Sequence, residues 1–338
     1  MKVSEIPRYS DSYFTRARIT CEHAGNNRRV VYQVFQRGDA VLCGIKYAVE
    51  LLQQTGPEVE VQGLADGDRI APLESVLHLH GPTQELVELE TVYLGLLSRM
   101  TRVATNISAV VEAANGKPVL FFGARFDATE VQEYDGYAAR IGGAQGASTP
   151  AGATAFGATA VGTMPHALIA AFKGDTVAAT LAVAAATPGQ PIWALVDFEN
   201  DSARTAVEVF KALRDRGLVL AGVRLDTAAG LVDKGVEEAG QKLTGVNPLL
   251  VEIVRRHLVE AGGKDVKIAV SGGFNPERIR EFERVGARVD AYGVGENALH
   301  GSTPFTSDVV GYYEDGRFVH CAKVGREYRP NPRMKKLK

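Results

Sequence analysis

Two glycine turns are the clearest candidates for chemistry in this 338-residue sequence. They read Ser271-Gly272-Gly273-Phe274 and Gly293-Val294-Gly295-Glu296, and each follows an apolar run typical of a buried strand. Glycine has no Cβ, so backbone N–H groups can approach an anion, and a helix opening at Asn275-Pro276 would add the positive end of its dipole. The pattern predicts a phosphate site, with two tight turns that bind nothing as the alternative.

Charged side chains follow three other apolar runs in the same half of the chain. The pairs are Arg125 with Asp127, Asp197 with Glu199, and Arg224 with Asp226. Carboxylates near a phosphate site can hold a divalent cation and stabilise positive charge at a reacting carbon, while arginines bind carboxylates or phosphates bidentately. Each pair alone would be an ordinary surface ion pair, but their shared position favours one site. In that site we expect Asp197 to have a catalytic role and Glu199 to bind substrate.

Two further side chains could contact a substrate. His166 ends the segment Gly162-Thr163-Met164-Pro165-His166, and an imidazole is nucleophilic near neutral pH because its unperturbed pKa is about 6.5. A structural hydrogen bond is the alternative for this histidine. Tyr13 could stack on a planar ring, although a core or interface tyrosine is the more ordinary interpretation.

The elements that must position these residues form an α/β pattern after Gly116. Helical segments such as 202–216 and 276–285 separate apolar runs, which lie at 119–122, 160–163, 192–196, 221–225, 268–270 and 291–294. With a weaker strand near 144–148, the pattern predicts about seven parallel strands, best closed as an α/β barrel with its site at one rim. A doubly wound open sheet is the alternative.

The first part of the chain has a different pattern. Residues 30–80 alternate apolar and polar side chains as half-buried strands do, with a helix expected at 45–53. Residues 83–114 have helical spacing, and the tail after 309 returns to alternation. An N-terminal α/β domain, sandwich-like in its layers, is therefore expected before the barrel.

Composition excludes several classes of protein. Hydrophobic residues make up 45% and charged residues 23%, as in ordinary globular proteins. Lys plus Arg (38) nearly balances Asp plus Glu (40), so no overall field would attract nucleic acid or an anionic membrane. Three scattered cysteines argue against a disulfide framework or structural zinc. With no stretch of about 20 apolar residues, a cytoplasmic location is expected.

Together these motifs resemble those of the nicotinate phosphoribosyltransferases, within the type II phosphoribosyltransferases that also include quinolinate and nicotinamide enzymes. The similar segments cover most of the chain, in the family's order, at 11–13, 122–125, 162–166, 222–226, 271–273 and 292–295. The resemblance implies an N-terminal α/β domain over 1–115 completed by the tail 300–338, and an incomplete α/β barrel over 116–299. It also implies a homodimer or higher homo-oligomer with sites at the subunit boundary.

The resemblance implies contacts to a pyridine acceptor. Phe122 would stack on one face of the ring and Tyr13 of the partner subunit on the other, and Arg125 would lie beside the ring's carboxylate. Ser148 and Thr149 lie in a segment similar to the family's acceptor-selecting stretch, and they offer hydroxyl groups without an acid.

The resemblance also implies contacts to phosphoribosyl pyrophosphate. Arg224 and Asp226 would contact its ribose and pyrophosphate, Asp226 would also hold Mg²⁺, and His166 would be phosphorylated by ATP. The 5-phosphate would be bound by Ser271, Gly272, Gly273, Gly293 and Gly295.

The expected activity is ATP-coupled, magnesium-assisted transfer of phosphoribosyl to nicotinate, giving nicotinate mononucleotide and pyrophosphate for NAD biosynthesis. Quinolinate phosphoribosyltransferase is the first alternative, although its second carboxylate calls for more cations than Arg125 and Arg224. A barrel isomerase or aldolase acting on a sugar phosphate would use the same glycine turns, as would a non-catalytic phosphate-binding protein.

Overall fold

The computed structural model describes residues 5–338, whose contacts divide the chain into two compact units. One unit comprises the residues up to 105 together with 300–338, and the other comprises 106–299. Each unit has its own sheet and its own hydrophobic core. The boundary at 105 lies within the long helix α5 (Glu90–Ala113).

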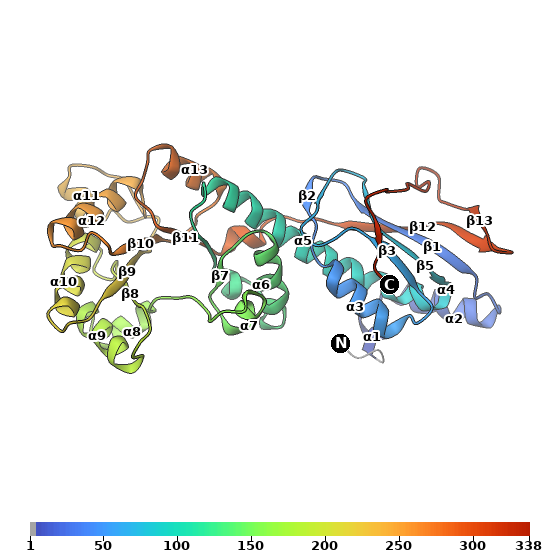
Figure 1. Ribbon diagram of the computed structural model, residues 1–338, viewed down its shortest axis with the longest axis horizontal. Coiled ribbons are helices and arrows are strands. Elements are labelled where there is room, and N and C mark those ends of the chain that lie inside the picture. The colour runs from blue at the N-terminus through green and yellow to red at the C-terminus, as the bar shows by residue number, and fades with distance from the viewer. Residues whose placement is uncertain (1–4) are drawn as a thin grey trace. The chain divides into compact units, whose positions relative to one another are not determined.

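The sheet of the second unit has six strands, all parallel, in the order β7-β6-β11-β10-β9-β8 (Figure 1). Their bounds are β6 (Val119–Phe121), β7 (Gly146–Ala147), β8 (Ile192–Leu195), β9 (Leu220–Leu225), β10 (Lys267–Val270) and β11 (Ala291–Val294). Because β7 and β8 are the two edges, the sheet does not close on itself within the described residues. The expected α/β fold with an incomplete parallel barrel is confirmed.

The sheet has six strands where about seven were expected, because one expected strand does not form. Residues 160–163 have no strand structure, although the Val161 N–H donates to the Ala147 carbonyl oxygen at 2.9 Å. The Val161 side chain also packs against Gly146, at the edge where a further strand would lie. Gly162 and Pro165 follow Val161 in the chain, and neither residue supports a continuous ladder of hydrogen bonds.

Helices contribute much of the second unit's core. They are α6 (Gln132–Ile141), α7 (Pro150–Ala153), α8 (His166–Ala171), α9 (Thr176–Ala186), α10 (Ser202–Arg214), α11 (Lys234–Glu238), α12 (Pro248–Glu260) and α13 (Pro276–Arg284). Short 3-10 turns lie at η3 (Gly123–Phe126), η4 (Thr129–Val131), η5 (Thr154–Phe156) and η6 (Glu296–Leu299). Apolar side chains of α10, α12 and α13 pack with the strands in one cluster. This packing explains why the strands read as nearly continuous apolar runs.

Asparagine-proline pairs determine where α12 and α13 begin. Asn247 accepts a hydrogen bond from the Leu250 N–H at 3.0 Å, and Asn275 accepts one from the Arg278 N–H at 2.9 Å. Proline follows each asparagine at the first helical position, where its fixed φ suits a helix and no N–H is needed. The start of α13 is thereby held directly behind the Gly272-Gly273 turn.

The first unit is built on a six-stranded sheet in the order β13-β12-β1-β5-β3-β14. Its strands are β1 (Arg29–Gln36), β3 (Glu60–Gly63), β5 (Ser75–Pro82), β12 (Phe305–Glu314), β13 (Arg317–His320) and β14 (Lys335–Lys336). A separate pair joins β2 (Ala40–Val41) to β4 (Arg69–Ile70). The helical elements are α1 (Ile6–Tyr9), α2 (Ser12–His23), α3 (Ile45–Thr55), α4 (Thr83–Leu86), η2 (Val87–Leu89) and the first part of α5. The tail therefore supplies three strands of this sheet.

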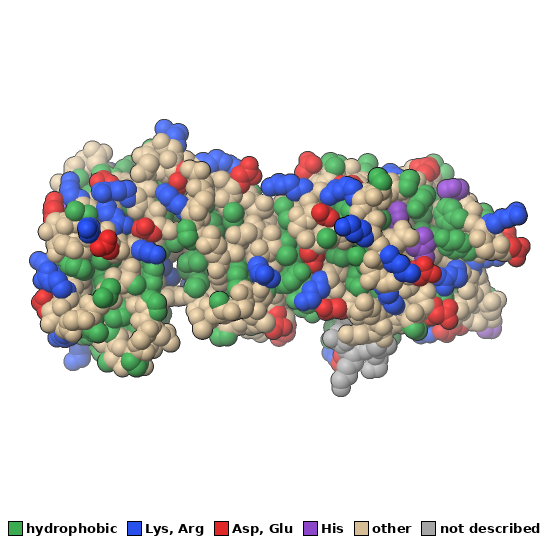
Figure 2. Space-filling view, viewed as in Figure 1, with side chains coloured by type: hydrophobic (Ala, Val, Ile, Leu, Met, Phe, Trp, Pro, Cys, Tyr) green, Lys and Arg blue, Asp and Glu red, His purple; other side chains and the backbone are tan. Residues whose placement is uncertain are grey.

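Charges of both signs are interspersed over the face drawn in Figure 2, in keeping with nearly equal numbers of acidic and basic residues. None of the helices in residues 5–338 combines the length and apolar character needed to cross a bilayer.

One buried carboxylate, Asp233, connects the starts of two helices. Its Oδ2 accepts from the Ser202 N–H at 3.0 Å and from the Ser202 hydroxyl at 2.7 Å, while Oδ1 accepts from the Gly235 N–H at 3.0 Å. Replacing it leaves these buried donors without an acceptor.

We expect Asp233→Ala to lower the free energy of unfolding by roughly 2–4 kcal/mol. Urea unfolding followed by circular dichroism measures the change, with the exposed Asp215→Ala as the matched control, expected within about 0.5 kcal/mol of wild type. Equal stability of the two variants would contradict this role for Asp233.

Candidate functional site

The carboxyl ends of the parallel strands meet at one edge of the second unit's sheet, so the residues that follow the strands share that rim. The residues at or just after the strand ends are Phe122 after β6, Ser148 after β7, Asp197 near β8, Asp226 after β9, Ser271 after β10 and Gly295 after β11. The rim therefore brings together residues that lie up to 173 positions apart in the chain. Most of the residues expected to form the site are at this edge.

Asp226 is held between two neighbouring strands. Its Oδ1 accepts a hydrogen bond from the Ser271 hydroxyl at 2.8 Å, and its Oδ2 lies 3.9 Å from Nη2 of Arg224. The Asp226 side chain is 27% exposed, so part of it still faces solvent. Ser271 was expected to bind phosphate, and in this structure its hydroxyl orients Asp226.

A second carboxylate, Asp197, pairs with the histidine at the start of α8. Nε2 of His166 lies 3.1 Å from Oδ2 of Asp197, with the histidine side chain 45% exposed and the aspartate only 6% exposed. Burial raises the pKa of Asp197, the His166 ring opposes that rise, and the charge of Asp226 adds to it. The two rim carboxylates therefore influence each other electrostatically.

These carboxylates fit a magnesium ion that arrives with a phosphorylated ligand. Magnesium usually takes one or two protein carboxylates and completes its shell with water and substrate phosphates. Oδ1 of Asp197 is buried and has no hydrogen-bond partner in the described residues, and Asp226 lies close enough to raise the pKa of Asp197. Residues 5–338 contain no group of three or more histidine, cysteine or acidic residues placed to hold a metal ion.

The first glycine turn has the backbone of an anion site. Gly272 and Gly273 have φ values of +93° and +69°, a region that side chains other than glycine rarely adopt. Within the described part of the chain, the N–H groups of both glycines donate to no acceptor. Both donors precede the amino-terminal end of α13, which favours negative charge.

Close packing explains why glycine occupies positions 293 and 295 in the second turn. A Cβ on Gly293 would lie 2.5 Å from the Phe122 ring, and one on Gly295 would lie 2.6 Å from the Phe126 ring and 2.9 Å from the Phe122 carbonyl oxygen. The Phe122 N–H donates to the Val294 carbonyl oxygen at 2.7 Å. These glycines therefore allow the segment after β6 to cross β11 closely, which places Phe122 at the rim.

The remaining expected residues have local partners or lie elsewhere. Thr149 caps α7 by accepting from the Gly152 N–H at 3.1 Å, and Glu199 pairs with Arg204. Arg125 is exposed in η3, and Ser148 is half-buried beside β7.

Tyr13 lies in α2 of the first unit, where its side chain is exposed and its hydroxyl donates to Asp11 at 3.4 Å. Its contact with a pyridine ring stays a prediction.

One residue at the rim, Arg278, could not be identified as a site residue from the sequence. Arg278, in the first turn of α13, donates to the Gly272 carbonyl oxygen at 2.5 Å and lies over the Phe274 ring. An arginine six positions after a glycine resembles any other helical arginine, and only the folded turn shows the contact.

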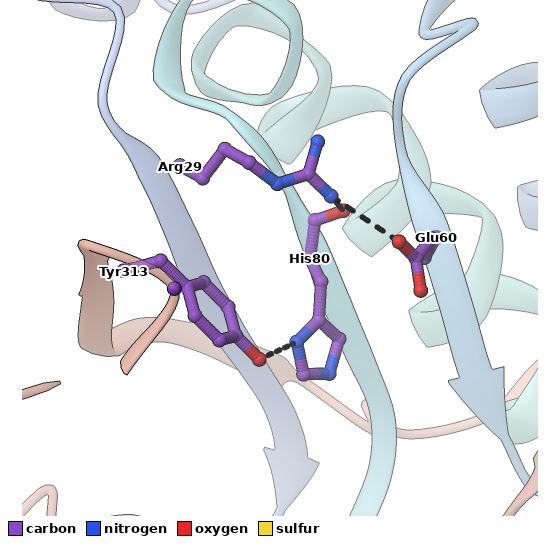
Figure 3. Close-up of a pocket in the computed structure, with 5 residues that line it drawn as sticks. Arg29, Glu60, His80 and Tyr313 are labelled. Atoms are coloured by element: carbon purple, nitrogen blue, oxygen red, sulfur yellow. Dashed lines mark hydrogen bonds and ion pairs between the residues drawn. The ribbon is translucent and has the colours of Figure 1, made fainter. Parts of the chain in front are cut away.

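The first unit has a polar pocket of its own, with a volume of about 440 Å³ (Figure 3). Nδ1 of His80 lies 3.2 Å from the Tyr313 hydroxyl, and Arg29 pairs with Glu60 at 3.4 Å. Burial lowers the pKa of His80, which favours the neutral form of the ring. The charges in this pocket therefore balance, in contrast to the open donors of the glycine turn.

Comparison with known proteins gives two family matches. The model for the N-terminal domain of quinolinate phosphoribosyl transferase matches residues 11–101, and that for its C-terminal domain matches residues 103–305. Together the two models cover most of the chain.

Among solved structures, nicotinate-nucleotide pyrophosphorylase from Pyrococcus furiosus is 32% identical, with a TM-score of 0.81 over 96% of this chain and 79% of that one. Human nicotinic acid phosphoribosyltransferase is 19% identical, with a TM-score of 0.72 over 90% of this chain and 75% of that one, and shows the shared fold alone.

Curated relatives include nicotinate phosphoribosyltransferases of Mycobacterium tuberculosis. One, pncB1, is 29% identical over 74% of this chain and 52% of its own length, and another, pncB2, is 30% identical over 70% and 47%. The chain spans about half the length of these relatives.

These comparisons confirm the type II phosphoribosyltransferase family and correct the expected branch. An ATP-coupled nicotinate enzyme of the ligase type is the wrong expectation, because the matching family models and the Pyrococcus structure indicate the quinolinate branch. Phosphate-binding motifs reflect the ligand that the branches share, so they could not decide between acceptors. By its match across both domains, the chain belongs to the quinolinate phosphoribosyl transferase family.

Proposed function

We propose that this protein is a quinolinate phosphoribosyltransferase. The ring nitrogen of quinolinate would form a bond to C1 of phosphoribosyl pyrophosphate as the bond to pyrophosphate breaks. The carboxylate next to that nitrogen would then leave as CO₂ and a proton would replace it, giving nicotinate mononucleotide. The family match over residues 11–101 and 103–305 carries this proposal, and the name of the Pyrococcus relative supports it.

The reaction asks mainly for positioning and charge stabilisation. A pyridine nitrogen is already a nucleophile, so the protein must align it with C1 and stabilise a positive centre as pyrophosphate departs. Asp226 is suited to the positive centre because Ser271 holds its carboxylate at the rim. His166, held by Asp197, is suited to contact the departing pyrophosphate.

Magnesium is proposed as the accompanying cation. Asp226 and the free Oδ1 of Asp197 would hold Mg²⁺, which neutralises pyrophosphate charge when it is bound. ATP has no place in this proposal.

The glycine turns and the arginines would bind the anionic groups of the two substrates. The N–H groups of Gly272 and Gly273 are suited to the 5-phosphate. Quinolinate has two carboxylates, and one of them would lie at the guanidinium of Arg224, whose side chain is 18% exposed and whose buried Nε has no hydrogen-bond partner among residues 5–338. Arg125 is exposed and could reach the other.

A homodimer or larger homo-oligomer remains a prediction. In such an assembly, the partner subunit's Tyr13 would cover the pyridine ring opposite Phe122.

The activity is tested by measuring pyrophosphate release from phosphoribosyl pyrophosphate and Mg²⁺ with quinolinate, nicotinate or nicotinamide, each with and without ATP. We expect release with quinolinate, accompanied by an equal amount of CO₂ and unaffected by ATP. Release with nicotinate alone, stimulated by ATP, would contradict the proposal.

The pairing of His166 with Asp197 predicts a shift in pH dependence. Burial raises the pKa of Asp197 and His166 lowers it, so removing the imidazole should raise that pKa further. If ionised Asp197 is needed, His166→Ala should move the acid limb of the kcat/KM profile to higher pH, because Asp197 becomes protonated sooner as the pH falls.

The matched control is His257→Ala on α12, whose ring contacts the Ile253 carbonyl oxygen away from the rim and should leave the acid limb in place. An acid limb that stays fixed or moves to lower pH in His166→Ala would count against the pairing.

A further inference from the structure

We propose that Arg278 is a positioning residue that fixes the phosphate-binding direction of the Gly272-Gly273 turn. The inference rests on the proposed function, in which this turn holds the 5-phosphate of phosphoribosyl pyrophosphate.

The guanidinium of Arg278 joins three segments around the turn. Nη1 donates to the Gly272 carbonyl oxygen at 2.5 Å, and Nη2 donates to the Val246 carbonyl oxygen in the segment before α12. The guanidinium carbon lies 4.3 Å from the centre of the Phe274 ring, which supports its flat face. The side chain is therefore held in place by contacts on its edge and on its face.

The contact to the Gly272 oxygen determines where the next N–H points. A trans peptide is planar, so its carbonyl oxygen and the following N–H point in opposite directions. By holding the Gly272 oxygen, Arg278 also orients the Gly273 N–H, which donates to no acceptor in the described residues. Glycine backbones adopt many conformations, so without the hydrogen bond from Arg278 the peptide between Gly272 and Gly273 would be free to rotate, and its N–H would no longer point toward the anion.

The charge of Arg278 also acts at the turn. No carboxylate forms a close ion pair with this guanidinium in residues 5–338, whereas Arg280 on the same helix pairs with Glu277 at 3.5 Å. A positive charge held against the same turn adds a favourable potential for an anion bound by the two free N–H groups. Lysine would keep the charge but could not reproduce the two directed hydrogen bonds and the stacked plane.

A purely structural role is the competing explanation, and the kinetics separate the two. Arg278→Met should raise the KM for phosphoribosyl pyrophosphate at least tenfold while kcat at saturation stays within about twofold, because the reacting groups at Asp226 and Asp197 are untouched. Calorimetric titration with ribose 5-phosphate should show the same loss of affinity. Arg278→Lys should fall between wild type and Arg278→Met.

Arg280→Met is the matched control, since it removes the same charge from the same helix and should leave both measurements unchanged. Wild-type affinity for ribose 5-phosphate in Arg278→Met, or a loss confined to kcat, would overturn the role of Arg278 and leave the proposed function intact. If Arg278→Met does not fold, the decision falls to Arg278→Lys, and unchanged affinity there overturns the role. Failure of wild type to bind ribose 5-phosphate would contradict both the phosphate site and this inference.

Discussion

Parallel pairing of the six strands is the constraint on which the candidate site depends. It places the carboxyl ends of all six strands at one edge, and thereby brings Phe122, Asp197, Asp226 and Ser271 to a single rim. The apolar strands pack in the core and hold this edge of the sheet in place. The residues that follow the strands provide the polar and aromatic side chains of the candidate site. A shift in the pairing of β9 with β10 would separate Ser271 from Asp226, so backbone register determines side-chain geometry.

The two glycine turns at this rim have different physical explanations. Gly272 and Gly273 have left-handed backbones and leave two donors free, which suits an anion. Gly293 and Gly295 have ordinary φ values, and their missing Cβ atoms make room for the segment that carries Phe122. One pair of glycines is suited to a phosphate, and the other pair allows the elements around it to approach.

Much of this site could be predicted from the sequence because the signals are local. Apolar runs that end in glycine or charged residues predicted the barrel and its rim, and the Asn275-Pro276 pair predicted the start of a helix that the structure places at Pro276. The run at 160–163 resembles a strand in the sequence because its residues are apolar, but in the structure the hydrogen bond from Val161 to Ala147 does not extend into a ladder.

Contacts between distant residues could not be predicted in the same way. The bond from Ser271 to Asp226 joins residues 45 positions apart, and that from Arg278 to Val246 spans 32. Neither pair shares a motif. The choice of acceptor could not be read from the short motifs either, and it was the match of the family models over residues 11–101 and 103–305 that indicated the quinolinate branch.

The most direct test of this account is a crystal structure of the wild-type protein with nicotinate mononucleotide bound. The account predicts the nucleotide phosphate within about 3 Å of the backbone nitrogens of Gly272 and Gly273, with the ribose beside Asp226. A phosphate bound away from these glycines, for instance beside Arg29 in the pocket of the first unit, would contradict it.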